Sequence, residues 1–78
     1  MFYVYVLLLK NSQYYVGYSK DLKLRINEHR LGRVKTTSKH LPFKLSFYAA
    51  FFNKEKATSF EKYLKSSSGF AFRNKRLL

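Results

Sequence analysis

Five residues carry groups that can do chemistry at positions where the sequence pattern predicts contact with a core: Tyr5, Tyr15, Arg25, His29 and Glu61. Tyrosine and histidine can pass protons to or from a nucleophile. Arginine presents a planar fork of donors that matches phosphate, and its charge persists at any working pH. A carboxylate binds Mg²⁺ together with waters and substrate phosphates. Together these groups are the parts of a site that cleaves phosphodiester bonds.

The charge of the chain points to the same class of substrate. Sixteen Lys and Arg against four Asp and Glu give a net charge of +12. Because self-repulsion at this density disfavours a compact state, we expect a polyanionic partner, with nucleic acid ahead of an anionic membrane surface. The residues predicted to form a DNA phosphate-binding face are Arg33, Lys35, Lys39, Lys44, Lys65, Arg73, Lys75 and Arg76.

Length and composition limit the other classes of protein. The 78 residues make one domain, residues 1–78, and 46% hydrophobic with 19% aromatic residues exclude disorder. With no cysteine, a disulfide scaffold, a cysteine-ligated zinc site and a cysteine nucleophile are excluded. The longest apolar run, Phe2–Leu9, is far shorter than the ~20 residues that span a bilayer and lacks the flanks of a signal peptide. We therefore expect a cytoplasmic protein without membrane contact.

Three strands are expected to form the sheet that positions these side chains. Residues 2–9 are apolar on both parities, which indicates a strand buried on both faces. Residues 13–19 form a second strand, in which Gly17 marks a bulge or a close approach by another group. Residues 45–52 are again apolar on both parities, so this third strand is predicted to be central.

Two helices carry the remaining candidates. Ser19 or Asp21 can cap a helix that ends at Gly32, and Asn53 can cap a second that ends within residues 66–69. At helical spacing, the first presents Leu22, Arg25, Ile26 and His29. The second presents Ala57, Phe60, Glu61 and Leu64 in the same way. Residues 32–42 form a basic loop, and residues 70–72 are expected to pack a last turn on the core. The order β-β-α-β-α predicts an α+β domain with a small antiparallel or mixed sheet.

The turn between the first two strands decides whether the two tyrosines meet. A three-residue turn at 11–13 would pair Lys10 with Tyr14 and Leu9 with Tyr15, and would place Tyr5 and Tyr15 on one face. A two-residue turn would shift the register by one and separate them. The sequence leaves both turns open.

At these positions the chain resembles a GIY-YIG nuclease domain, in the short single-domain bacterial branch related to the N-terminal domain of the excision-repair incision subunit. The two motifs are matched by Tyr3-Val4-Tyr5 and Tyr15-Val16-Gly17. Arg25 follows Tyr15 by ten residues and His29 follows four later, while Glu61 matches the acidic residue. Tyr3 replaces the first glycine, and only Asn74 is available for the family's late asparagine.

The resemblance implies a small three-stranded sheet flanked by helices and Mg²⁺- or Mn²⁺-dependent cleavage of DNA. It implies that Glu61 holds one metal ion and that Tyr5 acts as, or assists, the general base. It further implies that Tyr15 positions water or phosphate, that Arg25 stabilises the pentavalent phosphorus and that His29 orients or assists the phenol. A role in DNA repair, association with the nucleoid and targeting by a protein partner follow as expectations.

Less specific interpretations stay open beside this one. Each tyrosine taken alone is more often a packing residue, and we expect Tyr14, Tyr18, Tyr48 and Tyr63 to be such. Glu61 could pair with Lys65 one turn later, which is worth only about 0.3–0.5 kcal/mol. A GIY-YIG-like module that binds nucleic acid without cutting it is the first alternative function. A basic ribosome-associated or chromosome-coating protein is the second, and it has no use for Glu61.

Overall fold

The central strand of the fold is β1 (Phe2–Leu8), which lies between two antiparallel neighbours in the order β2-β1-β3. In this computed structural model, which describes residues 1–66, β2 spans Tyr14–Ser19 and β3 spans Lys44–Phe51. The prediction that the third strand is central was wrong. Residues Val4–Leu7 of β1 are wholly buried, whereas β3 is an edge strand with several exposed side chains. A run of apolar residues at both odd and even positions did not distinguish an edge strand from a central one.

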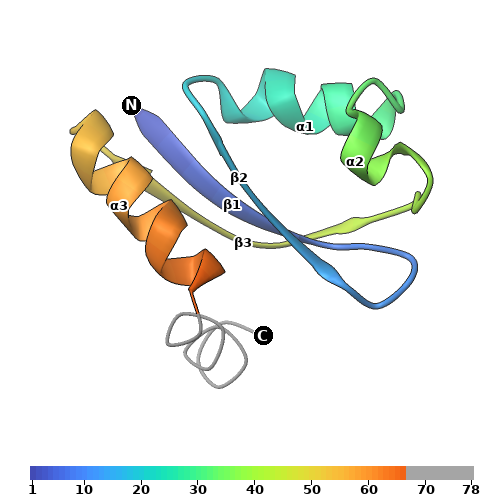
Figure 1. Cartoon of the computed structure of the whole chain (residues 1–78). Helices are drawn as coiled ribbons and strands as arrows, with labels where there is room; N and C mark the ends of the chain where they lie inside the picture. The colour runs from blue at the N-terminus through green and yellow to red at the C-terminus, as the bar shows by residue number, and fades with distance from the viewer. Residues whose placement is uncertain (67–78) are drawn as a thin grey trace.

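Helices cover the two faces of the sheet (Figure 1). On one face, Val4, Val6 and Val16 form a core cluster with Ala57 and Leu64 of α3 (Lys54–Lys65). On the other face, Tyr5, Leu7 and Leu9 pack with Ile26 of α1 (Leu22–Arg30). The expected α+β fold with a three-stranded sheet between helices is confirmed, and its sheet is antiparallel throughout.

The helix caps follow the expected chemistry. The Asp21 carboxylate accepts a hydrogen bond from the Leu24 amide at 3.0 Å, so Asp21 rather than Ser19 is the cap of α1. The chain leaves this helix through Gly32, whose φ of 72° suits a residue without a Cβ. Asn53 caps α3 through hydrogen bonds from the amides of Glu55 and Lys56.

One helix was not predicted. Within the basic segment expected to be a loop, Lys35–Ser38 form the short helix α2, giving the order β-β-α-α-β-α. Its cap residue, Val34, makes no side-chain capping hydrogen bond. The sequence therefore carries neither a cap nor an apolar repeat that would indicate a helix here.

The β1–β2 connection differs from both turns considered above. Leu8 pairs with Tyr14 and Leu7 with Tyr15, which is two residues from the register that a three-residue turn would give. The longer connection is closed by a hydrogen bond from the Leu9 amide to the Gln13 carbonyl at 2.9 Å. Because side chains alternate with a period of two, a shift by two preserves the face. Tyr5 and Tyr15 therefore lie on the same side of the sheet, as the nuclease interpretation requires.

In the part of the chain that the structure describes, no helix is both long enough and apolar enough to cross a membrane. The expected last turn at residues 70–72 lies outside the described residues.

Candidate active site

The absence of a side chain at Gly17 determines where the Tyr5 ring lies. Tyr5 on β1 is directly opposite Gly17 on β2, so both are on the face that α1 covers. A methyl group built at Gly17 would overlap the Tyr5 ring. The close approach predicted from Gly17 is therefore confirmed, while the β1–β2 register is continuous and contains no bulge there. The ring crosses over β2 towards the edge of the sheet.

The Tyr5 hydroxyl meets the imidazole of His29, which α1 presents from above the sheet. The Tyr5 Oη–His29 Nε2 distance is 2.8 Å, and both residues are wholly buried. The imidazole also contacts the rings of Tyr15 and Phe43 edge-on, with centroid separations of 5.3 Å and 6.0 Å. Hydrogen bonding and aromatic packing therefore fix the orientation of His29.

Thr37 of α2 holds the second nitrogen of this imidazole. His29 Nδ1 lies 2.8 Å from the Thr37 hydroxyl oxygen, which lies 3.4 Å from the Val34 carbonyl oxygen. A carbonyl can only accept, so the threonine hydroxyl donates to Val34 and accepts from Nδ1–H. This network assigns the Nδ1–H tautomer, in which Nε2 accepts the proton of Tyr5. Sequence reasoning missed Thr37 because it predicted a loop here and no other signal marks the residue.

Burial keeps both groups of this pair uncharged. It raises the pKa of Tyr5 to about 12, although the hydrogen-bonding Arg25 guanidinium offsets part of the rise. It lowers the pKa of His29 to about 4, and the positive charge of Arg25 acts in the same direction. At neutral pH the pair is therefore a phenol donating to a neutral imidazole.

Arg25 forms the boundary between this buried network and solvent. Its side chain is about one-third exposed and interacts with the Tyr5 hydroxyl, which raises the pKa of Arg25 and keeps the guanidinium charged. Arg25 Nη1 also lies 3.5 Å from Glu28 Oε1, at the long end of an ion pair. Exposed pairs of this kind contribute little to stability, so the arginine can be redirected to a phosphate at small cost.

Tyr15 joins the cluster from β2. Its ring centroid lies 6.4 Å from that of Tyr5. The side chain of Tyr15 is half-buried, whereas that of Tyr5 is wholly buried. The sequence-predicted Tyr5, Tyr15, Arg25 and His29 therefore come together at one edge of the sheet.

Glu61 lies on α3, which packs on the opposite face of the sheet from α1. Its side chain is 21% exposed, and its Oε2 lies 3.0 Å from Lys65 Nζ, so the i,i+4 pair considered above is formed. Its negative charge is the smallest of the causes that act on the pKa of Tyr5, which it raises. In the described structure, the hydrogen-bonding partner of Glu61 is therefore a lysine.

The donor set around Glu61 fits a cation held by one carboxylate. Among residues 1–66, no three His, Cys, Asp or Glu side chains gather as a metal-binding group. Mg²⁺ commonly takes one or two protein carboxylates and completes its shell with waters and substrate phosphates. Glu61 offers one partly exposed carboxylate of this kind.

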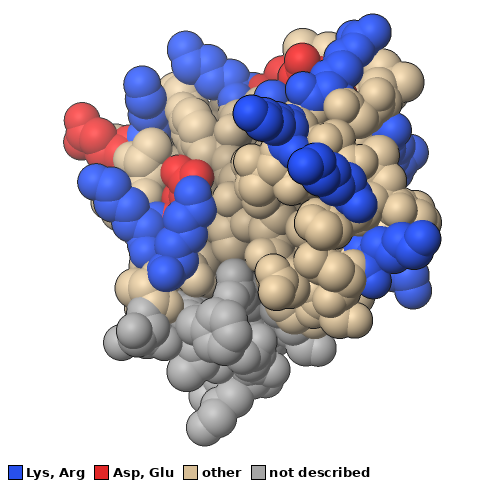
Figure 2. All heavy atoms as spheres, turned by 45° about the vertical axis from the view of Figure 1, so that its right-hand side comes forward, with Lys and Arg blue, Asp and Glu red and all other residues tan. Residues whose placement is uncertain are grey.

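Five of the eight predicted phosphate-binding residues lie in the described part of the chain. Arg33, Lys35, Lys39, Lys44 and Lys65 are exposed, and Lys65 is occupied by Glu61. Arg73, Lys75 and Arg76, together with Asn74, lie outside the described residues. Figure 2 shows far more basic than acidic surface on the face that it presents.

Known proteins are similar to this chain in sequence. A UPF0213 protein of Streptococcus pneumoniae is 41% identical over 64 residues, 81% of this chain and 65% of that protein. Another, from Lacticaseibacillus paracasei, is 37% identical over 65 residues, 82% of this chain and 73% of its own. The chain therefore spans slightly less than two thirds of the Streptococcus pneumoniae relative.

A solved structure and a family model also match this chain. The solution NMR structure of a UPF0213 protein from Bacillus halodurans matches with a TM-score of 0.62 and 33% identity, over 99% of this chain and 87% of that one. The model of the GIY-YIG catalytic domain matches residues 1–76. The chain belongs to the GIY-YIG family of nuclease domains.

Proposed function

We propose that this chain is a metal-dependent endonuclease that hydrolyses phosphodiester bonds of DNA. The observation that carries the proposal is the buried Tyr5–His29–Thr37 network beneath the charged, partly exposed Arg25. Three polar side chains joined in a wholly buried network are costly to place in so small a core. A network that orients groups at an exposed arginine is therefore better explained by chemistry on an anion than by packing.

Arg25 is assigned to the developing negative charge of the phosphoryl group. Its fork can reach two non-bridging oxygens, and these interactions strengthen as the pentavalent phosphorus forms. The hydroxyl of Tyr5, fixed by His29, interacts with the guanidinium and helps to position it. This explains how a residue on the sheet face can orient a charge at the rim.

The roles of the two phenols divide according to burial. The resemblance suggested Tyr5 as the general base, but Tyr5 is wholly buried with its pKa raised to about 12, and its proton already points to His29. A group in this state is poorly placed to take a proton from water. We therefore assign contact with the attacking water to the half-buried Tyr15. Tyr5 is then the residue that positions Arg25 and His29.

Glu61 is assigned to the metal ion, Mg²⁺ or Mn²⁺, once Lys65 turns away from it. Bound there, the cation would neutralise phosphate charge and lower the pKa of a bound water. Lys65 is more than half exposed, so the i,i+4 pair opposes this exchange only weakly. The roles in DNA repair, nucleoid association and recruitment by a protein partner belong to the same proposal and rest on the family resemblance alone.

A nucleic-acid-binding module without cleavage is the second candidate. One observation favours it, because Glu61 is paired with Lys65 rather than left open for a cation. This candidate retains the basic surface and Arg25 as phosphate contacts, and it gives the Tyr5–His29 pair a purely structural role.

Plasmid nicking with Mg²⁺ and with EDTA separates the two candidates. The endonuclease nicks with Mg²⁺ only, and Arg25→Ala lowers its rate by roughly 10²–10³, the size of one lost electrostatic donor. Arg25→Lys recovers little, because a point charge does not replace the fork. Lys54→Ala, which removes an exposed cation at the start of α3, is the control and keeps the parental rate. A parent chain that binds DNA but never nicks it would leave the binding module as the function.

A further inference from the structure

One part of the sheet face under α1 is left uncovered. Leu45 and Tyr48 of β3 pair with Leu7 and Tyr5, so their side chains share the face that α1 covers. Yet Leu45 is 40% exposed and Tyr48 is 52% exposed, while their partners on β1 are wholly buried. The β3 side of this face therefore presents an apolar and aromatic strip to solvent.

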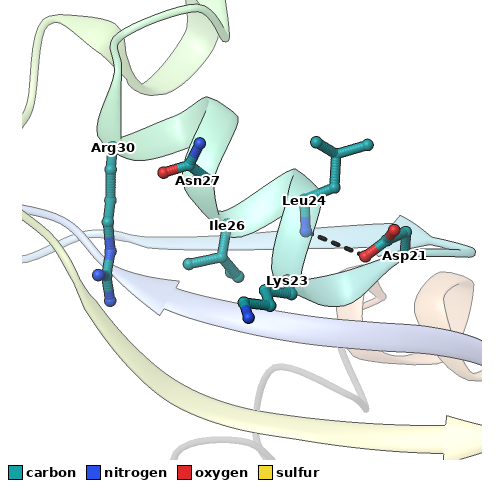
Figure 3. A pocket seen from close by; sticks show the side chains of 6 residues that line it. All are labelled: Asp21, Lys23, Leu24, Ile26, Asn27 and Arg30. Carbon is teal, nitrogen blue, oxygen red and sulfur yellow. Dashed lines mark hydrogen bonds between the residues drawn. The ribbon is translucent and has the colours of Figure 1, made fainter.

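This strip forms the floor of an open groove beside α1. A hollow of about 580 Å³ is lined by Tyr3, Leu45 and Tyr48 from the strands and by Lys23 and Ile26 from α1. A neighbouring hollow of about 480 Å³ shares Lys23 and Ile26 and extends along the helix to Arg30. Figure 3 shows Lys23, Ile26 and Arg30 directed towards the strands, whereas Leu24 points away from them. We call this feature, lined by Tyr3, Lys23, Ile26, Arg30, Leu45 and Tyr48, the α1–β3 groove.

The groove is separate from the cluster around Tyr5 and Arg25. Lys23 and Arg30 follow one flank of α1, and the helical period places Arg25 on the other. A ligand in the groove would therefore contact the opposite side of the helix from the proposed active site.

The charges of the groove select an anion. Lys23 and Arg30 are exposed on its helical wall. The Asp21 carboxylate at its end is engaged as the cap of α1, 3.0 Å from the Leu24 amide. A second copy of the chain, itself at +12, would be repelled from this wall, whereas a polyanion would be attracted.

We propose that the α1–β3 groove binds a single-stranded segment of nucleic acid, with a base stacked on Tyr48 and its phosphates held by Lys23 and Arg30. An exposed aromatic ring beside cations is the usual device for single strands, because every base has a face that can stack. The hollow has the volume of a small-ligand pocket, which is room enough for an unstacked base. The proposal extends the proposed function by adding a second contact region for its substrate.

The test is anisotropy of a short fluorescein-labelled oligothymidylate, titrated in EDTA so that no metal-dependent cleavage occurs. Tyr48→Ala should weaken binding about tenfold through lost stacking and leave the salt slope unchanged. The double variant Lys23→Gln/Arg30→Gln should reduce that slope by about 0.7 for each lost phosphate contact. The matched controls are Phe52→Ala, an aromatic that is 89% exposed, and Lys54→Gln/Lys56→Gln at the start of α3.

The outcomes separate this proposal from the endonuclease. The groove proposal is overturned if Tyr48→Ala binds oligothymidylate as tightly as Phe52→Ala does. It is also overturned if a blunt duplex competes as well as the single strand. Self-association that Tyr48→Ala abolishes would assign the strip to a dimer and also overturn it. Tyr48-dependent binding in a chain that never nicks a plasmid would support the groove while refuting the endonuclease.

Discussion

Thr37 offers a sharp test of the buried network because two substitutions separate its hydroxyl from its volume. Valine has nearly the shape of threonine but cannot accept the His29 Nδ1–H, and serine keeps the hydroxyl while losing a buried methyl group. Thr37 is wholly buried, and water cannot replace the lost acceptor without rearrangement. Thr37→Val should therefore destabilise the fold by about 1–3 kcal/mol, the cost of an unsatisfied buried donor. Thr37→Ser should cost about 1 kcal/mol, for the methyl group alone.

Stability by itself would not show what Thr37 does, so the tautomer of His29 must be measured as well. Nitrogen-15 NMR of the imidazole distinguishes a protonated Nδ1 from a protonated Nε2. The parent and Thr37→Ser should both show the Nδ1–H form, because each supplies an acceptor at Nδ1. In Thr37→Val, His29 should lose that preference and populate both tautomers. In the Nε2–H form, His29 cannot accept the Tyr5 proton.

Two results would refute this reasoning. One is a parent His29 protonated at Nε2, since Tyr5 could then not donate to it. The other is a Thr37→Val variant with parental stability and an unchanged tautomer, which would mean that the hydroxyl positions nothing.

Two further predictions concern the same network. Gly17→Ala should destabilise the fold by about 1–3 kcal/mol through overlap with the Tyr5 ring, and the cost should fall in a Tyr5→Leu background, as urea unfolding of the four chains would reveal. Since the folded state lowers the pKa of His29 from 6.5 to about 4, the unfolded chain binds the extra proton between these values. The contribution of His29 to the free energy of unfolding, up to about 3 kcal/mol, is therefore complete above pH 6.5 and is lost as the pH falls towards 4. Urea unfolding across this range should show the loss in the parent and not in His29→Gln; equal slopes would contradict it.

Much of the fold and the cluster could be predicted from local signals. Asp21 and Asn53 marked the starts of two helices by their capping chemistry. The helical spacing of Arg25 and His29 predicted a shared face, and Gly17 predicted the close approach that the Tyr5 ring makes.

What could not be predicted depends on contacts between distant segments. The position of β3 at an edge is set by which strands pair, and its apolar run looks the same at an edge or in the centre. The short helix α2 has no side-chain cap, so Thr37 had no visible reason to lie against His29. The burial that keeps the proton on Tyr5 likewise emerges only once α1 and α2 close over the sheet.

Glu61 decides between an enzyme and a binding module, because a carboxylate beside a phosphate site repels the substrate unless a cation lies between them. The measurement is paired: plasmid nicking rate and filter-binding affinity of the parent and Glu61→Gln, each with Mg²⁺ and with EDTA. Glu55→Gln removes an exposed carboxylate from the same helix and is the matched control.

If Glu61 holds the metal ion, Glu61→Gln should fold, lose nicking at any practical Mg²⁺ concentration, and bind DNA in EDTA as well as or better than the parent. Glu55→Gln should nick at the parental rate. A Glu61→Gln chain that nicks as fast as the parent in Mg²⁺ would remove Glu61 from the site and contradict the proposed one-metal endonuclease.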